Sequence, residues 1–200
     1  MAILDATGRV LLRRGYDGCT TNLVAEVAGV GIGSLYEYFP NKDALVAALI
    51  EREIDAFVAT LEREMVATFD RPFSDALRSA LGAALDYLEA RRDLVRILMA
   101  EYPHFGQLPA IGRLPRRVSE LAASCLRSWG DELSFEDHPA NAYVIATMLG
   151  GVYLSQTLAP VAPVPRDAML DALVPILLRV LQPRATRREP DATAKSDAER

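Results

Sequence analysis

The chain has 200 residues, of which 50% are hydrophobic and 24% are charged, and its formal net charge is −5. That length and apolar content suit one large domain or two small ones with a packed core. No apolar run reaches the ~20 residues that a spanning helix needs, and the N-terminus lacks a basic region followed by an apolar stretch. Neither a membrane span nor a secretion signal is expected, and we expect a cytoplasmic protein. In that compartment Cys19 and Cys125, far apart in the sequence, are expected to be reduced thiols.

The first helix is expected over Ile3–Arg14, with arginines at its C-terminal end, where the helix dipole favours them. Gly15 can cap this helix. Two short helices follow, Thr21–Ala28 and roughly Ile32–Phe39, joined by a turn that begins at Gly29, where a positive φ is cheap only for glycine. This is the layout of a helix-turn-helix, whose second helix lies in the major groove of DNA.

The second short helix has two unlike faces. At about 100° per residue, one face is apolar and is expected to dock on neighbouring helices; it consists of Ile32, Leu35, Tyr36 and Phe39. Gly33, Ser34 and Glu37 point the other way, with Tyr38 at the flank. This small, polar side allows a base edge to come close.

A long helix is expected from Lys42 to about Thr68, capped by Asn41. Because its start belongs to the predicted DNA-binding part and its far end to the rest, it is a natural lever between them. No run alternates convincingly enough for a strand, so the fold is predicted to be all-α. From Pro183 onward the chain is charged and poor in large apolar residues, and it is expected to stay disordered. The remaining helices are predicted over Phe73–Ala90 (with Ser74 as a possible cap), Leu94–Glu101, from Pro109 or Leu114 to Trp129, Pro139–Leu158 and Arg166–Leu181.

The last two predicted helices have features of a subunit interface. Gly150 and Gly151 stand in mid-helix at a cost of roughly 1 kcal/mol each relative to alanine. They indicate either the close approach of a partner helix or a kink or tight packing within one subunit. The last helix is apolar nearly all round, whereas a monomer's surface helix would show a polar stripe, and Pro175 should bend or break it. The predicted interface residues are Tyr143, Gly150, Gly151, Leu154, Leu170, Leu173 and Leu177.

A set of residues between Thr20 and Leu45 stands in a fixed register: Thr21, Val24-Ala25, Ala28-Gly29-Val30, Gly33, Leu35-Tyr36, Tyr38-Phe39, Asn41-Lys42 and Leu45. This set resembles the tetracycline-repressor (TetR) family of bacterial regulators. The resemblance implies a three-helix helix-turn-helix DNA-binding head at residues 1–47 and a helical bundle for effector binding and dimerisation at residues 48–182, with residues 183–200 as the tail. It also implies a homodimer, usually through the final two helices, and an effector site in clefts between helices.

The head offers eight candidate DNA contacts. Thr21 is expected to cap its helix, to contact a phosphate, or both, and Lys42 is a good phosphate partner. Ile32 either touches a thymine methyl group or packs, and Glu37 repels phosphate unless it accepts from a cytosine amino group. Gly31 stands where many family members have Ser, which removes a side-chain cap. The candidates are Thr21, Asn22, Ile32, Gly33, Ser34, Tyr36, Tyr38 and Lys42.

The predicted head lacks the basic field that is typical of DNA-binding domains. Its first 47 residues carry four basic side chains (Arg9, Arg13, Arg14, Lys42) and five acidic ones (Asp5, Asp17, Glu26, Glu37, Asp43). Affinity would have to come from hydrogen bonds, helix N-termini and the doubled contact of a dimer.

Aromatic and methionine side chains in the C-terminal part could line an effector pocket or form ordinary core. The candidates are Tyr87, Met99, Tyr102, Phe105, Trp129, Tyr143 and Met148. Enzyme signatures are missing: there is no GxSxG, no HExxH and no phosphate-binding glycine loop, and two distant histidines do not make a metal site. We therefore predict no catalytic residue, no metal site and no cofactor.

These features predict a ligand-responsive transcriptional regulator, most simply a repressor that a small apolar effector releases from a partly palindromic double-stranded DNA operator. The alternative is a helical ligand- or partner-binding protein of the same fold that has lost DNA binding, which the near-neutral head favours.

Overall fold

The computed structural model describes residues 2–126, 139–161 and 163–181, and its regular elements over these ranges are helices alone. The predicted all-α fold is confirmed, and α7 starts at the earlier of its two predicted positions. Trp129 and the predicted tail, residues 183–200, lie outside the described residues. The elements are α1 (Ala2–Arg14), α2 (Thr21–Ala28), α3 (Ile32–Tyr38), α4 (Lys42–Ala67), α5 (Phe73–Ala90), α6 (Arg92–Glu101), the 3₁₀ turn η1 (Phe105–Gln107), α7 (Pro109–Leu126), α8 (Pro139–Leu158) and α9 (Arg166–Leu181).

Local chemistry sets the helix ends in the first part of the chain. Gly15 and Gly29 have φ values of 66° and 70°, as expected for glycines that end helices. The Gly29 N–H donates to carbonyl oxygens of the last turn of α2, and Asn41 accepts the N–H of Ala44 at 2.8 Å at the start of α4. These ends fix the lengths and the directions of α2, α3 and α4.

The predicted cap of α5 is wrong, and of the bend or short break predicted at Pro175 of α9 the break is absent. Ser74 does not cap α5, because the helix begins at Phe73 and the capping position is Pro72, which has no side-chain hydrogen bond to offer. α9 continues through Pro175, so the predicted break is absent. Pro175 lies on the exposed side of α9.

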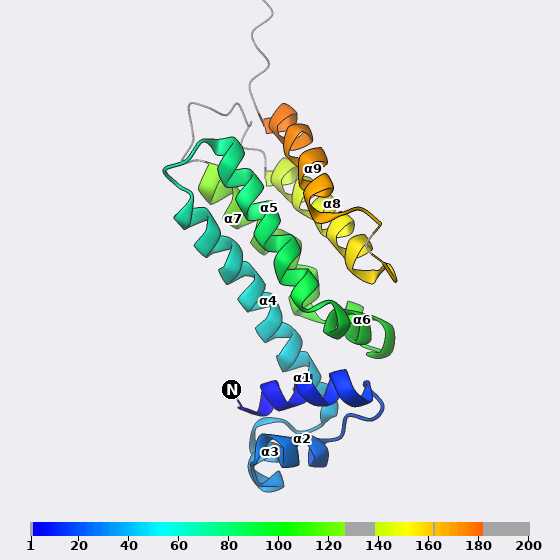
Figure 1. Cartoon of the computed structure of the whole chain (residues 1–200). Helices are drawn as coiled ribbons and strands as arrows, with labels where there is room; N and C mark the ends of the chain where they lie inside the picture. Colours follow the sequence, from blue (N-terminus) through cyan, green and yellow to red (C-terminus); the bar gives the residue numbers. More distant parts are fainter. Residues whose placement is uncertain (1, 127–138, 162, 182–200) are drawn as a thin grey trace, which may run out of the picture.

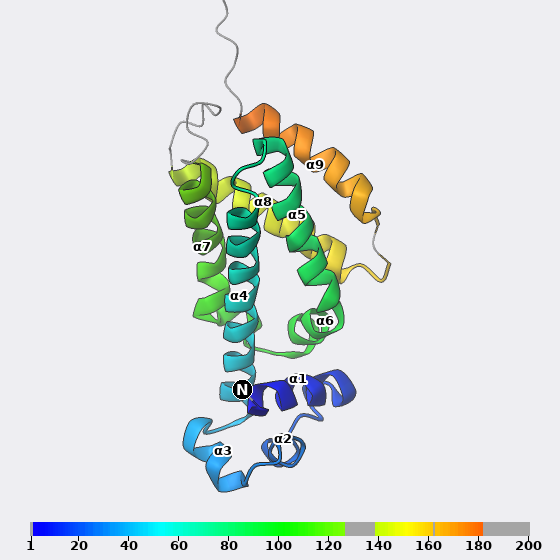
Figure 2. The ribbon, with the colours of Figure 1, turned by 60° about the vertical axis from the view of Figure 1, so that its left-hand side comes forward.

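The helices form a long body with a small head at one end (Figure 1). α1, α2 and α3 make the head, and α4 runs from the head along the body beside α5 (Figure 2). α8 packs mainly against α7, and α9 packs against α5. The head thus lies at one end of α4, while the far end of α4 reaches the region of α9.

Two clusters of buried side chains hold this arrangement together. The first joins α1, α2 and α3 to the start of α4, to α6 and to the start of α7, and it crosses the predicted domain boundary at residue 47 through Ile54, Leu94, Leu98 and Tyr102. The second lies in the body and includes Leu61, Leu81, Tyr153, Leu170 and Leu177. The head therefore shares its core with the near end of the body.

Tyr16 is the residue where three elements of the first cluster meet. Its backbone N–H donates to the carboxylate of Glu101, at the end of α6, over 2.7 Å. Its hydroxyl donates to Asp43 of α4, and its ring lies 5.3 Å from that of Tyr102 between centroids. Burial, and then the hydrogen bond to Asp43, raise the pKa of this phenol, so it stays protonated as a donor. Tyr16 thus fixes the end of α1 to both α4 and α6.

Glu53 makes a second polar link, between α4 and α5. Its carboxylate accepts from Arg91 at 2.6 Å, from Arg52 at 3.2 Å and from the Tyr87 hydroxyl at 3.1 Å. Burial alone would raise the pKa of Glu53, but the hydrogen bonds from Arg91, Tyr87 and Arg52 outweigh it, and the pKa is lowered from its ordinary 4.5. The charged form of Glu53 therefore stabilises the fold.

We expect Glu53→Gln to lower the free energy of unfolding at pH 7 by about 1–3 kcal/mol, since it weakens charged hydrogen bonds in a half-buried site. The folded pKa is depressed, so this stabilisation is fully present above the ordinary value of 4.5 and is lost as the pH falls through the lowered folded value. Urea unfolding from pH 7 to pH 3 should therefore show the gap between wild type and variant closing at the acid end. The exposed Glu62→Gln on the same helix is the control and should stay within about 0.5 kcal/mol. A gap that is the same at every pH would contradict this role of Glu53.

Candidate nucleic-acid interface and apolar cavity

α3 is anchored by one side chain and leaves most of its surface open. Leu35 is completely buried, whereas Gly33, Ser34 and Glu37 are exposed. Ile32 and Tyr36 were expected on the docking face, and this is wrong: they are 39% and 49% exposed. A helix of only seven residues touches the head through a narrow strip, so the flanking positions stay in solvent. The open surface is thus wider and more apolar than the sequence predicted.

The N-terminus of α2 and the side of α3 meet through two hydroxyl groups. Thr20, not Thr21, caps α2, because its side chain accepts the N–H of Leu23 at 3.2 Å. The prediction that Thr21 caps the helix is therefore wrong; Thr21 is its first residue. Its Oγ1 lies 3.0 Å from the hydroxyl of Tyr36. Two predicted contact residues from different helices are thereby brought together beside a helix N-terminus, where backbone N–H groups are unpaired.

The ammonium of Lys42 is engaged within the head. Its Nζ donates to the carbonyl oxygen of Tyr16 at 3.0 Å and lies 3.7 Å from the centroid of the Tyr16 ring. Lys42 is half-buried, and only part of its three-hydrogen donor capacity is used. The sequence did not reveal this contact, because Tyr16 lies 26 residues away.

The other candidate contacts are exposed side chains of the same end of the molecule. Asn22 on α2 and Tyr38 at the end of α3 are both exposed, Tyr38 to 72%. Gly31 precedes α3 without a side-chain cap, as expected. α2 and α3 form the end of the head that points away from the body (Figure 1).

Contacts within the protein occupy two of the five acidic side chains of the head. Asp5 pairs with Arg52 at 2.7 Å, and Asp43 accepts the Tyr16 hydroxyl. Glu26 and Glu37 are exposed on α2 and α3. Two of the acidic side chains that make the head near-neutral are therefore already paired with other groups of the protein.

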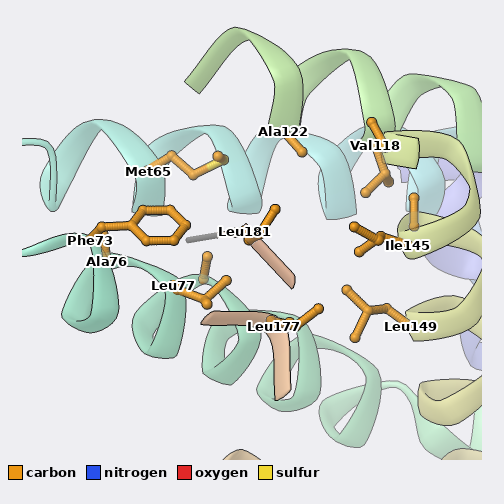
Figure 3. A pocket seen from close by; sticks show the side chains of 13 residues that line it. Met65, Phe73, Ala76, Leu77, Val118, Ala122, Ile145, Leu149, Leu177 and Leu181 are labelled. Carbon is orange, nitrogen blue, oxygen red and sulfur yellow. The ribbon is translucent and has the colours of Figure 1, made fainter. Parts of the chain in front are cut away.

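An apolar cavity of about 120 Å³ lies in the body, away from the head. Its walls come from α4, α5, α7, α8 and α9, whose side chains point into a common space (Figure 3). All thirteen lining residues are apolar: Met65, Phe73, Ala76, Leu77, Ala80, Val118, Ala122, Ala142, Ile145, Ala146, Leu149, Leu177 and Leu181.

None of the described candidates for effector binding lines this cavity. Tyr102 is buried in the core shared with the head, where Phe105 packs as well, and the hydroxyl of Tyr87 donates to Glu53. Met99 is half-buried on α6 outside the lining, Tyr143 and Met148 are exposed on α8, and Trp129 lies outside the described residues. The predicted aromatic side chains among the described residues lie in the core or on the surface, and the cavity is lined mainly by alanine and leucine side chains, with Phe73 as the aromatic residue among them. The signal that could have found it is the run of alanines on the inner sides of α5 and α8.

The candidate interface residues divide between the outside and the inside of the subunit. Tyr143, Gly150 and Gly151 are exposed and Leu154 is half-buried. Leu170 and Leu177 are wrong as interface residues, because they are buried in the core of their own subunit, against which the half-buried Leu173 also packs. The outer face of α9 instead presents Ile176 and Val180, each 57% exposed.

The two mid-helix glycines of α8 have open space beside them in the subunit. A Cβ atom added at Gly150 or Gly151 would meet nothing within 4 Å. Tight packing within one subunit therefore does not explain them. Their open backbone adjoins exposed apolar side chains of the same helix, Val144 and Met148.

Within the described residues, no helix is long and apolar enough to cross a membrane, and no group of three or more His, Cys, Asp or Glu side chains is placed to hold a metal ion. Cys19 is a buried free thiol, and burial raises its pKa.

A helix-turn-helix that shares its core with an all-helical body defines a class of DNA-binding transcription regulators. The family model of bacterial regulatory proteins of the tetR family matches residues 3–49. The HTH-type transcriptional repressor KstR of Mycolicibacterium smegmatis is 30% identical over 157 residues, which cover 78% of this chain and 74% of KstR.

Solved structures have the same fold. A TetR-family transcriptional regulator from Mesorhizobium loti superposes with a TM-score of 0.72 at 18% identity, over 91% of this chain and 96% of that one. The SmeT–triclosan complex superposes with a TM-score of 0.64 at 22% identity, over 94% and 96% of the two chains. The chain belongs to the TetR family. It is a DNA-binding regulator of transcription rather than an enzyme, and regulators of this family act as dimers.

Proposed function

We propose that this regulator is a repressor whose dimer binds a partly palindromic operator through α3 and leaves it when an effector binds in the body. The observation that supports this most is the surface of α3, where Leu35 alone is buried and Gly33 and Ser34 are open to a base edge. KstR is named as a repressor, which favours repression over activation. The alternative of a protein without DNA binding is not favoured, because the relatives are named transcriptional regulators and repressors.

The proposed contacts divide by chemistry. Gly33, Ser34 and Ile32 face the bases, with Ile32 able to cover a thymine methyl group. The hydroxyls of Thr21 and Tyr36 lie in contact, and the one whose hydrogen is free can donate to a phosphate together with N–H groups at the N-terminus of α2. Asn22 on α2 and Tyr38 at the end of α3 are also exposed and complete the proposed contacts with the DNA backbone. Such contacts need little net positive charge in the head.

Lys42 has two candidate roles. Its ammonium retains donor capacity beyond the bond to Tyr16, so it can also reach a phosphate next to α4. It also holds the Tyr16 carbonyl and ring in place. We propose that it does both and so links the position of the head to the DNA backbone.

The proposed dimer forms through the outer faces of α8 and α9. Val144, Met148 and Gly151 recur at helical spacing on α8, and Ile176 and Val180 do so on α9; all are exposed. An obligate helical dimer buries at least ~2,000 Å² of surface in total. These five residues alone cannot supply that area, so the whole length of both helices has to take part. Two-fold symmetry of the protein then calls for two half-sites in the operator.

The proposed effector acts by linkage. The head, residues 1–47, and the body, residues 48–182, share α4, whose first residues contact Tyr16 and whose far end carries Met65 in the cavity wall. An effector that prefers a body geometry with the two heads wrongly spaced weakens operator binding, and operator weakens effector binding by the same factor. SmeT, of the same fold, was solved with a small molecule, triclosan.

For the DNA contacts we expect Ser34→Ala to change sequence preference and Lys42→Ala to weaken all sequences alike. Loss of one phosphate contact should flatten the dependence of log K on log salt by roughly 0.9. The measurement is titration of a duplex recovered by genomic selection, at several salt concentrations, with Arg63→Ala at the far end of α4 as the control. A salt slope that Lys42→Ala leaves unchanged would show that Lys42 only holds Tyr16. Failure of selection to recover any enriched site would overturn the proposed DNA contacts.

For the dimer we expect Gly151→Arg to give a monomer, because a charged side chain would enter the interface without a partner. Light scattering should then report one 21.9 kDa chain at micromolar concentration, against two for the wild type. Gly112→Arg is the matched control: this glycine is also exposed, in a helix and free of neighbours within 4 Å, but it lies on α7. A wild-type monomer, or equal dissociation of both variants, would contradict the proposed interface.

A further inference from the structure

The cavity between α4, α5, α7, α8 and α9 has an unusual lining for a ligand site: thirteen apolar residues and no polar side chain. Typical small-molecule pockets add a few polar groups that orient the ligand. Figure 3 shows Leu77, Ile145, Leu149 and Leu177 pointing into the space from three different helices.

Two buried hydroxyl groups of α8 lie outside the lining and are hydrogen-bonded within the protein. The Tyr153 hydroxyl donates to the carbonyl oxygen of Leu81 at 3.3 Å, and the Thr157 hydroxyl donates to that of Tyr153 at 2.9 Å. In the part of the chain that the structure describes, no buried side-chain nitrogen or oxygen lacks a hydrogen-bond partner. Because all thirteen lining residues are apolar, a polar group of a ligand would find no side-chain donor or acceptor in the cavity wall.

From this lining we propose that the cavity binds an uncharged hydrocarbon group of about the size of benzene or smaller, and that its occupancy alters the dimer. The size follows from the volume of about 120 Å³, slightly below the ~150 Å³ of an engineered apolar cavity in another protein that stays dry and binds benzene or xenon. The hydrocarbon is either a free small molecule or the end of a longer amphiphile. The regulatory part of this inference rests on the proposed function, because the hydrocarbon is the chemical class of the effector proposed above.

The coupling to the dimer follows from the position of the walls. Ile145 and Leu149 line the cavity from the inner side of α8, while Val144 and Met148, one residue away from each, are exposed on its outer side. On α9, Leu177 lines the cavity next to the exposed Ile176. Because interiors are close-packed, a ligand that enlarges this space has to move α8 or α9 against α5 and α7, and the outer faces move with them.

The binding test uses benzene, phenol and hexanoate as probes with the full-length protein, by calorimetry. Benzene should bind, and phenol should bind roughly 5- to 150-fold more weakly, because its hydroxyl would lose its water partners. Binding of hexanoate that also blocks benzene would identify the end of an amphiphile as the occupant. No binding of either benzene or hexanoate would overturn the site.

Matched variants locate the site. Ala80→Leu adds three carbon atoms to the cavity wall and should weaken benzene roughly tenfold or more. Ala83→Leu, on the same helix and also half-buried but facing away from the cavity, should leave benzene binding unchanged. If Ala80→Leu does not fold, Ala146→Leu obstructs the same space from α8, and a crystal of the wild type under xenon pressure should show xenon between Leu77, Leu149 and Leu177. Equal benzene binding by the cavity and control variants, or xenon elsewhere, would contradict the assignment.

The regulatory part has its own readout. Sedimentation with and without saturating benzene should show the dimer dissociation constant changed by about fivefold or more. An unchanged constant together with benzene binding would overturn the coupling and leave the hydrocarbon site intact. If no operator exists, benzene binding and the dimer shift would still be seen, so failure of the proposed DNA function is distinguishable from failure of this inference.

Discussion

The fixed position of Tyr16 is the constraint on which the geometry of the head depends. Helices of eight and seven residues, such as α2 and α3, are too short to be stable in water by themselves. They are held by α1 and α4, and Tyr16 ties the end of α1 to both α4 and α6 through its N–H, its hydroxyl, its carbonyl oxygen and its ring. The turn before Tyr16 requires glycine at position 15 for two reasons. Gly15 has a positive φ, and a Cβ there would lie 2.6 Å from the Glu101 carboxylate. Tyr16 therefore holds the end of α1 against the start of α4 and the end of α6.

This dependence explains how a head of near-zero net charge can serve DNA binding. Asp43 and Asp5 are committed to Tyr16 and Arg52, so part of the negative charge is spent on placing the helices. In the proposed contacts, the head offers DNA a small number of hydroxyl and backbone groups, among them the hydroxyls of Thr21 and Tyr36, which lie 3.0 Å apart. A dimer doubles these contacts on one duplex, and the second half-site binds at high effective concentration. Geometry between the two heads then matters more for affinity than their charge.

The sequence predicted the features that neighbouring residues determine. Gly29 ends α2, Asn41 caps α4, and the tetR register places α3, because each depends on a few adjacent residues. Thr20 and Thr21 are both suitable caps, and only the path of the loop decides between them. The contacts of Lys42 and Tyr87 with Tyr16 and Glu53 span 26 and 34 residues, so no local pattern contains them.

The sequence predicted other residues for an effector site than those that line the apolar cavity. Aromatic residues were expected to line it, yet Tyr102 and Tyr87 have a large surface to bury and polar tips to satisfy, which takes them into packed or paired positions. The cavity wall instead includes small side chains from two helices, Ala76 and Ala80 of α5 and Ala142 and Ala146 of α8.

α8 and α9 are apolar on nearly all sides, so the sequence did not show which side of each helix faces the core of its subunit. The structure gives a physical reason for this apolar character. The inner side of each helix belongs to the core and to the cavity wall, as Leu149 and Leu177 show, and the outer side presents Met148 and Ile176 to the solvent of a single subunit. Exposing such a face is unfavourable unless a partner covers it. In the proposed dimer each helix is therefore a wall between the cavity on one side and the partner subunit on the other, and a close-packed wall cannot be displaced on one side without being displaced on the other.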